Sequence, residues 1–471
     1  MRGPRRLACL ALFVLCGLLV SGCGDSPDVA ELTFRTLAAP GSDEYRVLER
    51  VLETFHKDKA SRGIRVTLVG DRQKLEYVLR NLIARRSADV VEVRAGEVAF
   101  LASRGAVESF PAYCMLRARE CHRAAWRWGV LNQELYAIPW AARPKLLLYD
   151  KGALGRVRGA DAAPPRTWDE LLRVAARLRE QADEEGAEGV YPFALAAKRS
   201  VDLGRHFATF LSQLGPPLLE EREGRWAFNI DHRAGRAAMR FLLHLRQSAP
   251  PECVVSGDKA ALDQFHSGRA AMVLAGPEGL WIDPDRERQM DIGVARVPVP
   301  GPRAASRCDV GLRYVVVPAF LRGARKEAAV RLAKFMAGEE AQEIVREGVG
   351  GATPMIPVRR AVLAGEWYRR RPELGAFAAA LDHAAPVVPW FAWEGKCSKD
   401  WIGGLHSLLI QYGEPGEQKV NDVAALTQTR GDQALSCLHT RIGHPSATMT
   451  LGMSIVGVLV FIAVAYAASR H

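Results

Sequence analysis

The sequence predicts an α/β fold in which a mainly parallel sheet is flanked by helices. At the start of the body of the chain, three strand-like segments alternate with two amphipathic helical segments. A strand–helix–strand order of this kind places successive strands in parallel and covers the faces of the sheet with helices. At 471 residues the chain is also long enough for two domains with hydrophobic cores of their own.

The elements of the first part follow from hydrophobic periodicity. Residues 32–37 are a predicted strand, residues 64–68 alternate as a second strand, and residues 89–93 form a third. Ser42 can cap the helix after the first strand, because its side-chain oxygen can accept a hydrogen bond from the first helical turn. Residues 75–83 present an apolar face typical of a second helix.

Strand and helix signals continue through the rest of the body. Thr167 and Glu170 form a capping box that opens a long helix. Residues 270–275 are an apolar strand, residues 314–317 are another, and residues 328–336 carry one helical apolar face. These elements alternate without an internal sequence repeat, which favours a second α/β unit rather than a repeat protein.

The amino terminus predicts export. Arginines precede an apolar run over residues 7–20, and small residues follow it, as in a secretory signal. The end of the run, Val20-Ser21-Gly22-Cys23, resembles the bacterial lipobox, in which the cysteine thiol is acylated before cleavage. This resemblance implies a mature chain that begins at lipid-modified Cys23, outside the cytoplasmic membrane. An uncleaved anchor, or an ordinary signal with a chance cysteine, is the alternative.

The carboxyl terminus is apolar too. Residues 451–468 carry no charge, and a helix of that length rises about 27 Å, close to the hydrocarbon thickness of a bilayer. We therefore predict a transmembrane helix over residues 451–469, with a buried core helix and a removed sorting tail as alternatives. Residues 410–450 lose periodicity and gain Gly, Pro, Ser and Thr, so they are predicted to be a linker.

Charge and cysteine content limit the class of function. The formal charge is +11, but no basic run is interleaved with aromatic residues, which argues against nucleic-acid binding. Beyond the signal and Cys23 the chain has an even number of cysteines, which suggests disulfides in an oxidising compartment. Pairing of nearest neighbours would give Cys114–Cys121, Cys253–Cys308 and Cys397–Cys437.

The sequence offers little support for catalysis or for a metal or cofactor. No Cys-x-x-Cys, His-Glu-x-x-His, Gly-x-Ser-x-Gly or phosphate-loop motif occurs. We therefore expect neither an enzyme nor a protein with a resident cofactor.

Several weak motifs in a fixed order resemble the family 1 extracellular solute-binding proteins, the maltose-binding-like receptors of ABC importers. They are Asp89-Val90-Val91, Leu101 to Glu108, Leu135 to Trp140, Leu147 to Lys151, Pro165 to Leu172, Phe265 to Met272, Gly276-Pro277 and Ala328 to Val345. Residues 386–390 and 405–409 resemble the C-terminal part of that family. Each motif alone is weak, but their order over about residues 30 to 435 is specific.

The resemblance implies a two-lobed periplasmic-binding-protein fold, with a ligand held in the cleft between two α/β lobes. The domains it implies are the signal 1–22, lobe one (28–142 and 312–352), lobe two (143–311 and 353–436), a linker (437–450) and the terminal helix.

The resemblance also implies which residues face the ligand. Positions that carry Asp and Trp in sugar-binding members are Arg94 and Glu97 here, and Arg143 replaces an Asp after Trp140. Glu278 stands where Trp is common, with Trp281 nearby, and Trp390 is a further candidate. Because Arg recognises carboxylate or phosphate bidentately, an anionic or zwitterionic ligand held by Arg94 and Arg143 is one hypothesis. The alternative is that these arginines are ordinary surface charges.

Taken with the two apolar ends, the resemblance implies a membrane-anchored receptor that captures a small solute, a sugar or an anion, and delivers it to ABC permease subunits. Its expected partners are that solute, the permease and membrane lipid. The alternative is a ligand-sensing or scaffold subunit of a membrane complex, which the second apolar anchor motivates.

Overall fold

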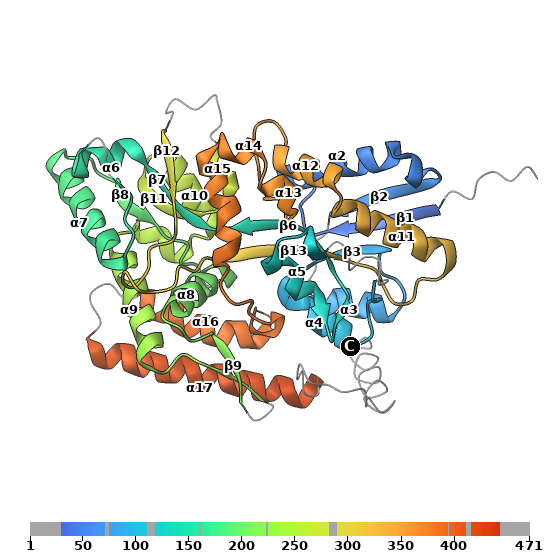
Figure 1. The fold of residues 1–471 in the computed structure, drawn as a ribbon. Coiled ribbons are helices and arrows are strands. Elements are labelled where there is room, and N and C mark those ends of the chain that lie inside the picture. Colours follow the sequence, from blue (N-terminus) through green and yellow to red (C-terminus); the bar gives the residue numbers. More distant parts are fainter. Residues whose placement is uncertain are drawn as a thin grey trace, which may run out of the picture.

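The computed structural model describes residues 30–70, 75–110, 118–159, 163–222, 225–281, 290–393, 395–410 and 416–442. In these residues the chain forms two α/β lobes joined by crossing strands, which confirms the predicted two-lobed architecture (Figure 1). The signal segment, Cys23 and the predicted membrane helix 451–469 lie outside the described residues. Within the described residues, no helix is both long enough and apolar enough to cross a membrane.

The first lobe is built on a five-stranded sheet. Its strands are, in spatial order, β2 (Ile64–Gly70), β1 (Ala30–Thr36), β3 (Val90–Arg94), β13 (Val310–Val316) and β6 (Ile138–Pro144). The first three pair in parallel as predicted, whereas β13 runs antiparallel to both of its neighbours. The sheet is therefore mixed rather than mainly parallel, because β13 brings the chain back from the other lobe.

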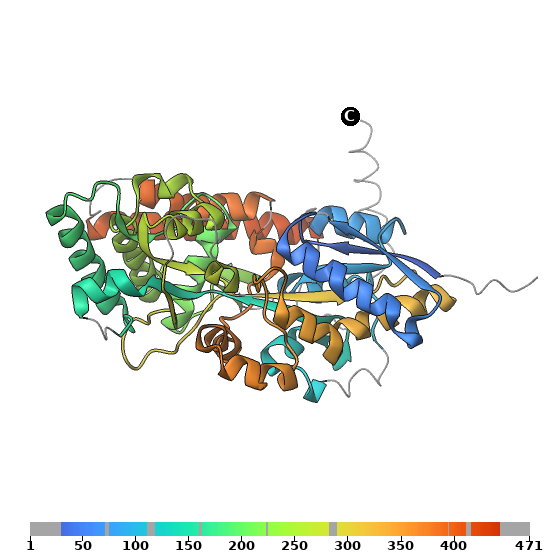
Figure 2. The ribbon, with the colours of Figure 1, turned by 90° about the horizontal axis from the view of Figure 1, so that it is seen from above.

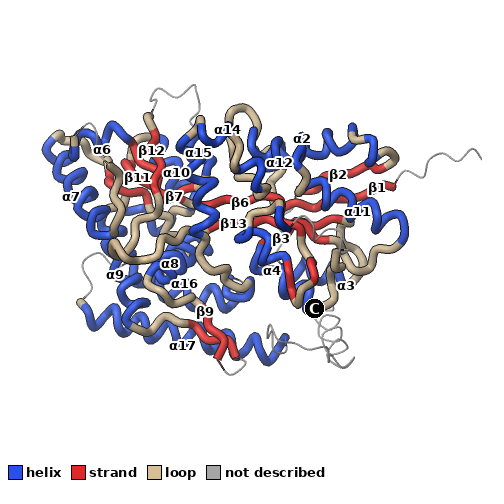
Figure 3. Tube along the Cα trace, viewed as in Figure 1, coloured by secondary structure: helices blue, strands red, loops and turns tan. Residues whose placement is uncertain are grey.

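Helices cover both faces of this sheet (Figure 3). Apolar side chains of α2 (Asp43–Lys57), α11 (Gly323–Met336) and α12 (Glu339–Glu347) share one core cluster with the sheet. Those of α3 (Leu75–Ile83) and α4 (Ala95–Ser103) belong to another. The Ser42 side chain accepts a hydrogen bond from the backbone N–H of Tyr45 at 3.3 Å, so the predicted cap of α2 is confirmed.

The second lobe has a smaller, four-stranded sheet. Its order is β12 (Ile292–Ala295), β7 (Leu146–Asp150), β11 (Ala270–Ala275) and β8 (Tyr191–Ala194). β7 is antiparallel to both neighbours, so this sheet is mixed as well. The helices of this lobe are α6 (Lys151–Arg158), α7 (Trp168–Glu184), α8 (Val201–Gln213), α9 (Arg233–Gln247), α10 (Asp258–His266), α16 (Gly395–Ile410) and α17 (Glu417–Ile442).

The remaining elements are short. They are β4 (Val130–Leu131), β5 (Glu134–Leu135), β9 (Leu219–Arg222), β10 (Arg225–Phe228), α5 (Arg123–Trp126), α13 (Arg360–Leu363), α14 (Glu366–Arg369), α15 (Pro372–Ala379), and the 3-10 helices η1 (Lys59–Ser61), η3 (Arg127–Gly129), η4 (Pro251–Val255), η5 (Pro277–Leu280), η6 (Ala380–His383) and η7 (Trp390–Trp393).

The chain crosses between the lobes through paired backbone. β6 ends in the first sheet at Pro144, and β7 begins in the second sheet at Leu146. β13 returns beside β6, and the backbone of Ile356 then pairs with Ala142 through N–H···O distances of 2.7 and 2.8 Å. The hinge therefore consists of hydrogen-bonded strands, which fixes the side chains at its crossing point.

Helix α17 is the main difference from the sequence prediction. Residues 410–450 were expected to be a linker, but residues 417–442 form a helix along one long side of the second lobe (Figure 2). Gln428 Oε1 accepts hydrogen bonds from the backbone N–H groups of Ile230 and Asp231 at 2.8 and 3.0 Å. Asp432 Oδ1 accepts one from Phe228 at 2.7 Å.

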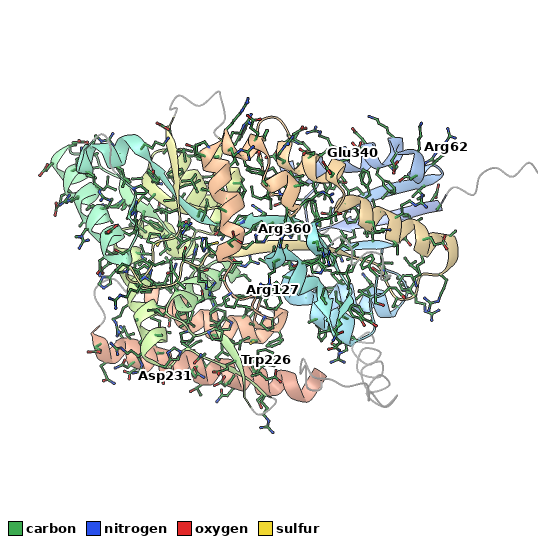
Figure 4. All side chains as sticks on the ribbon, viewed as in Figure 1. Arg62, Arg127, Trp226, Asp231, Glu340 and Arg360 are labelled. Carbon is green, nitrogen blue, oxygen red and sulfur yellow. The ribbon has the colours of Figure 1, made fainter. Side chains whose placement is uncertain are left out.

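Figure 4 labels Trp226 and Asp231, which lie where α17 meets the strand β10 and the loop that follows it. Polar side chains of α17 thus accept hydrogen bonds from the backbone at the end of β10 and in the loop after it, as a neighbouring strand would. The linker prediction is wrong for residues 417–442, because a helix held by polar contacts with the lobe does not need the regular apolar periodicity that this segment lacks.

The expected disulfides of Cys253 and Cys308 are wrong. Cys253, Cys308 and Cys397 are buried free thiols, so neither the Cys253–Cys308 nor the Cys397–Cys437 pairing is formed. Cys308 Sγ instead lies 3.5 Å from the carbonyl oxygen of Ala380 and donates to it. Buried cysteine often serves as a small apolar side chain, which explains three thiols in lobe cores. Cys114 lies outside the described residues, so its pairing with Cys121 remains a prediction.

Candidate functional site

A cavity of about 740 Å³ lies between the lobes. The first lobe contributes Leu37 and residues 94–97, and the hinge contributes Arg143, Lys145 and residues 309–313. The second lobe supplies the starts of α8 and α10, residues 274–276 and Glu278, and the segment before α16 supplies residues 385–388 and Trp393. Both lobes and the hinge therefore form its walls.

Four helical segments begin at the cavity, which explains why carboxylates gather there. α4, α8, α10 and η5 each carry an acidic side chain in the first turn, namely Glu97, Asp202, Asp258 and Glu278. A carboxylate at this position stabilises a helix because it opposes the partial positive charge of the N-terminus. The residues thus have a structural reason to be there besides any contact with a ligand.

Arg94 and Glu97 line the cavity as predicted sites but are bound to each other. Glu97 Oε2 accepts a hydrogen bond from the backbone N–H of Arg94 at 2.9 Å, and its Oε1 accepts one from Arg94 Nη1 at 3.1 Å. This pair closes the first turn of α4. A ligand anion at Arg94 would have to compete with Glu97.

Arg143 joins the two lobes. From the end of β6 its Nη1 donates to Glu44 of α2, and its Nη2 lies 2.9 Å from Glu278 Oε1 at the start of η5. Burial acts to lower the pKa of the Arg143 guanidinium, but Glu278 and Glu44 outweigh it, and the pKa is raised. Glu44, Arg143 and Glu278 therefore form one ion-pair network that connects the two lobes at the hinge.

Arg313 is a cavity residue that the sequence interpretation missed. Its Nε lies 3.8 Å from Glu92 Oε1 and its Nη2 lies 3.8 Å from Glu44 Oε2. Glu92 itself accepts hydrogen bonds from Thr36 Oγ1 at 2.6 Å and from the backbone N–H of Leu37 at 2.8 Å. Burial lowers the pKa of Arg313, because Glu92 and Glu44 offset only part of the cost of burying its positive charge. Arg313 lies opposite Arg94 in the pairing of β13 with β3, so knowledge of this strand register would have placed it beside a predicted site residue.

The wall of the second lobe carries a second ionic group. Lys145 Nζ donates to Asp258, whose other oxygen lies 3.9 Å from His206 Nε2. Burial acts to raise the pKa of Asp258, but Lys145 and His206 outweigh it and lower the pKa to about 2. Burial and Lys145 together lower the pKa of His206 to about 4, so this imidazole is neutral near pH 7.

The aromatic predictions fare differently. Trp140, expected to face the ligand, is 1% exposed in the core of the first lobe and is not among the residues that line the cavity. It lies three residues, about 10 Å of strand, before the cavity residue Arg143. Trp281 is 39% exposed and does not line the cavity. The side chain of Trp390 is outside the description, whereas its neighbour Trp393 does line the cavity.

Among the described residues, no group of three or more His, Cys, Asp or Glu side chains is arranged to hold a metal ion. The cavity chemistry is instead that of paired charges and one indole, an arrangement suited to reversible binding of a polar molecule.

Comparisons with known proteins agree with this geometry. Residues 52–376 match the family model described as bacterial extracellular solute-binding protein. A search of curated protein sequences finds no match.

Solved structures with a similar fold include maltose-bound MalE3 of T. maritima, with 22% identity, TM-score 0.68, and coverage of 87% of this chain and 99% of that one. A solute-binding protein of Agrobacterium vitis with bound D-mannitol has 17% identity and TM-score 0.66, and the match covers 88% and 100% of the two chains. MalE of Xanthomonas citri has 18% identity and TM-score 0.68, covering 87% and 98%.

Proposed function

Because this chain belongs to the bacterial extracellular solute-binding proteins, we propose that it captures a small polar solute between its lobes and delivers it to an ABC importer. The observation that carries the proposal is the cavity of about 740 Å³, because both lobes and the hinge contribute to its walls. A solute in that position contacts two bodies at once, so binding favours one arrangement of the lobes over others.

The chemistry of the cavity supports a polyhydroxylated solute. Hydroxyl groups can both donate and accept hydrogen bonds, which suits walls that carry carboxylates and guanidinium groups together. Trp393 offers an aromatic surface against which a sugar ring can pack. Similar folds were solved with maltose and with D-mannitol, which are solutes of this type.

The anionic-ligand hypothesis finds less support. Arg94 is bound to Glu97, and Arg143 is bound to Glu44 and Glu278. A ligand carboxylate at either arginine would displace a carboxylate of the protein and gain little net interaction. We keep Arg94, Glu97, Arg143 and Glu278 as proposed wall residues of the binding site, with hydroxyl groups as their partners.

We further propose that the protein works outside the cytoplasmic membrane, held by a lipid on Cys23 and by the apolar segment 451–469. Both rest on the sequence. The sensing or scaffold alternative uses the same cleft without transport. The two differ in whether solute-loaded protein stimulates ATP hydrolysis by its permease complex.

The decisive experiment is a thermal-shift screen of the protein with pentoses, hexoses, disaccharides and polyols, followed by calorimetry on each hit. A ligand at one hundred times its Kd adds about 2.7 kcal/mol to the free energy of unfolding, which gives a clear rise in Tm. Trp393→Leu should weaken binding, whereas Trp281→Leu, a change outside the cavity, should not. Failure of every solute to raise Tm, or equal effects of the two variants, would contradict the proposal.

A further inference from the structure

Most charged side chains that line the cavity are paired within the protein. The pairs are Arg94 with Glu97, Arg143 with Glu44 and Glu278, Lys145 with Asp258, Arg205 with Asp309, and Lys259 with Asp263. Two cavity residues differ from these. Asp202 on the second lobe forms no ion pair among the described residues, and Arg313 on the hinge strand β13 approaches Glu44 and Glu92 only to 3.8 Å. One is an acid and the other a base.

Asp202 lacks a cationic partner among the described residues. No Lys, Arg or His of that part of the chain forms an ion pair with its carboxylate within 4.0 Å. Its Oδ2 accepts only long hydrogen bonds, from the backbone N–H of Asp258 and from Ser200 Oγ, both at 3.4 Å. Burial and the neighbouring charge of Asp258 raise the pKa of Asp202. Lys145 and Arg205 offset this rise only in part, so a cation placed beside the carboxylate would reduce the remaining electrostatic cost.

The side chain of Arg313 donates no hydrogen bond to any of the described residues. Its closest carboxylates, Glu44 and Glu92, lie 3.8 Å away and are engaged with Arg143 and with Thr36. Its Nη1 is buried and has no hydrogen-bond partner among the described residues. A guanidinium group has five donors, so an oxygen of a bound solute can supply what the protein does not.

We propose that the solute carries an ammonium group, held by Asp202, and an oxygen acceptor, held by Arg313, as in an amino sugar. The inference rests on the proposed function, because it concerns the same cleft, but it goes further by naming a charge on the ligand. A hydroxyl or a carboxylate oxygen can serve at Arg313, whereas an ammonium group gives Asp202 the charge compensation that a hydroxyl donor lacks. The lobes then hold opposite ends of one molecule.

Four matched probes test the inference by calorimetry at pH 7. They are D-glucosamine, D-glucose, N-acetyl-D-glucosamine and muramic acid, which differ in the ammonium group and in a carboxylate. We expect glucosamine to bind at least tenfold more tightly than glucose or N-acetylglucosamine. A further gain with muramic acid would assign a carboxylate to Arg313, and equal affinity would assign a hydroxyl. Glucosamine that binds no better than glucose overturns the inference, whatever other solute binds, and the screen above then decides the proposed function separately.

Two variants locate the effect. Asp202→Asn should reduce the preference for glucosamine over glucose at least fivefold, and Asp202→Glu should retain part of it. Asp183→Asn removes the same charge from α7 of the same lobe, where its partner Arg179 also lies outside the cavity, and should leave the preference unchanged. Circular dichroism and the Tm of each ligand-free variant check folding. An unchanged preference in folded Asp202→Asn overturns the assignment.

Discussion

Glu44 and Glu278 stand on different lobes and share one cation, the guanidinium of Arg143. The distance from Arg143 Nη2 to Glu278 Oε1 is 2.9 Å, and Nη1 donates to Glu44. The helix start of α2 in the first lobe is thereby joined to η5 in the second through a hinge residue. Breaking this bridge should therefore affect both lobes.

Arg143→Met should lower the free energy of unfolding by about 3 kcal/mol, because two partly buried carboxylates lose their partner. The measurement is urea denaturation at pH 7. The double variant Arg143→Met/Glu278→Gln should recover part of the loss, since one uncompensated charge is removed as well. A loss below about 0.5 kcal/mol would show that the bridge is only a surface ion pair.

Acid should weaken the second lobe through Asp258. Its pKa is lowered from 3.8 to about 2, so its contribution to stability is complete above pH 4 and is lost as the pH falls through the folded value. The carboxylate is 38% exposed, so we expect a modest contribution of about 1 kcal/mol. Wild type and Asp258→Asn compared by urea denaturation between pH 2 and 7 should differ at neutral pH and converge near pH 2. A gap that is constant with pH would contradict this.

Trp140 should matter for stability and not for binding. Trp140→Phe shrinks a side chain that is 1% exposed and should cost about 2 kcal/mol through the cavity it leaves. Calorimetry on the folded variant should give an unchanged Kd for any solute found by screening. A tenfold loss of affinity at unchanged stability would place the indole at the ligand after all.

The free thiols should be unreactive until the protein unfolds. Burial raises the pKa of Cys253 to about 11 and that of Cys308 to about 12, so little thiolate forms near pH 7. Iodoacetamide without any reductant should leave Cys253, Cys308 and Cys397 unmodified in the native protein and label all three in urea. Peptide mass spectrometry reads both results. Disulfide-linked peptides containing Cys253 or Cys308 would contradict the structure.

Local pattern was enough to predict the strands and helices at the start of the first lobe. Alternation over residues 64–68 and the Ser42 cap depend on neighbours in sequence, and both are found. The mixed character of the sheets could not be predicted in this way, because the direction of β13 depends on a chain that returns from the other lobe. Arg313 was missed for the same reason.

The candidate site was predicted in part. Arg94, Glu97, Arg143 and Glu278 do line one cavity, yet their partners could not be inferred, since Glu44 is 99 residues from Arg143 in sequence. Family spacing placed Trp140 close to the cavity, but burial beneath the helices of the first lobe withdraws its side chain. Asp202 gave no sequence signal, because a first-turn acid is common in any helix.

Helix α17 has a mechanical consequence. Gln428 and Asp432 fasten it to backbone of the second lobe on both sides of Ile230, and Gly404 of α16 packs directly against its Thr427. Helix α17 and the second lobe should therefore move together as one rigid body when a force acts on the helix. If α17 is held in place, the second lobe is held with it, and any opening or closing of the cleft is then a movement of the first lobe.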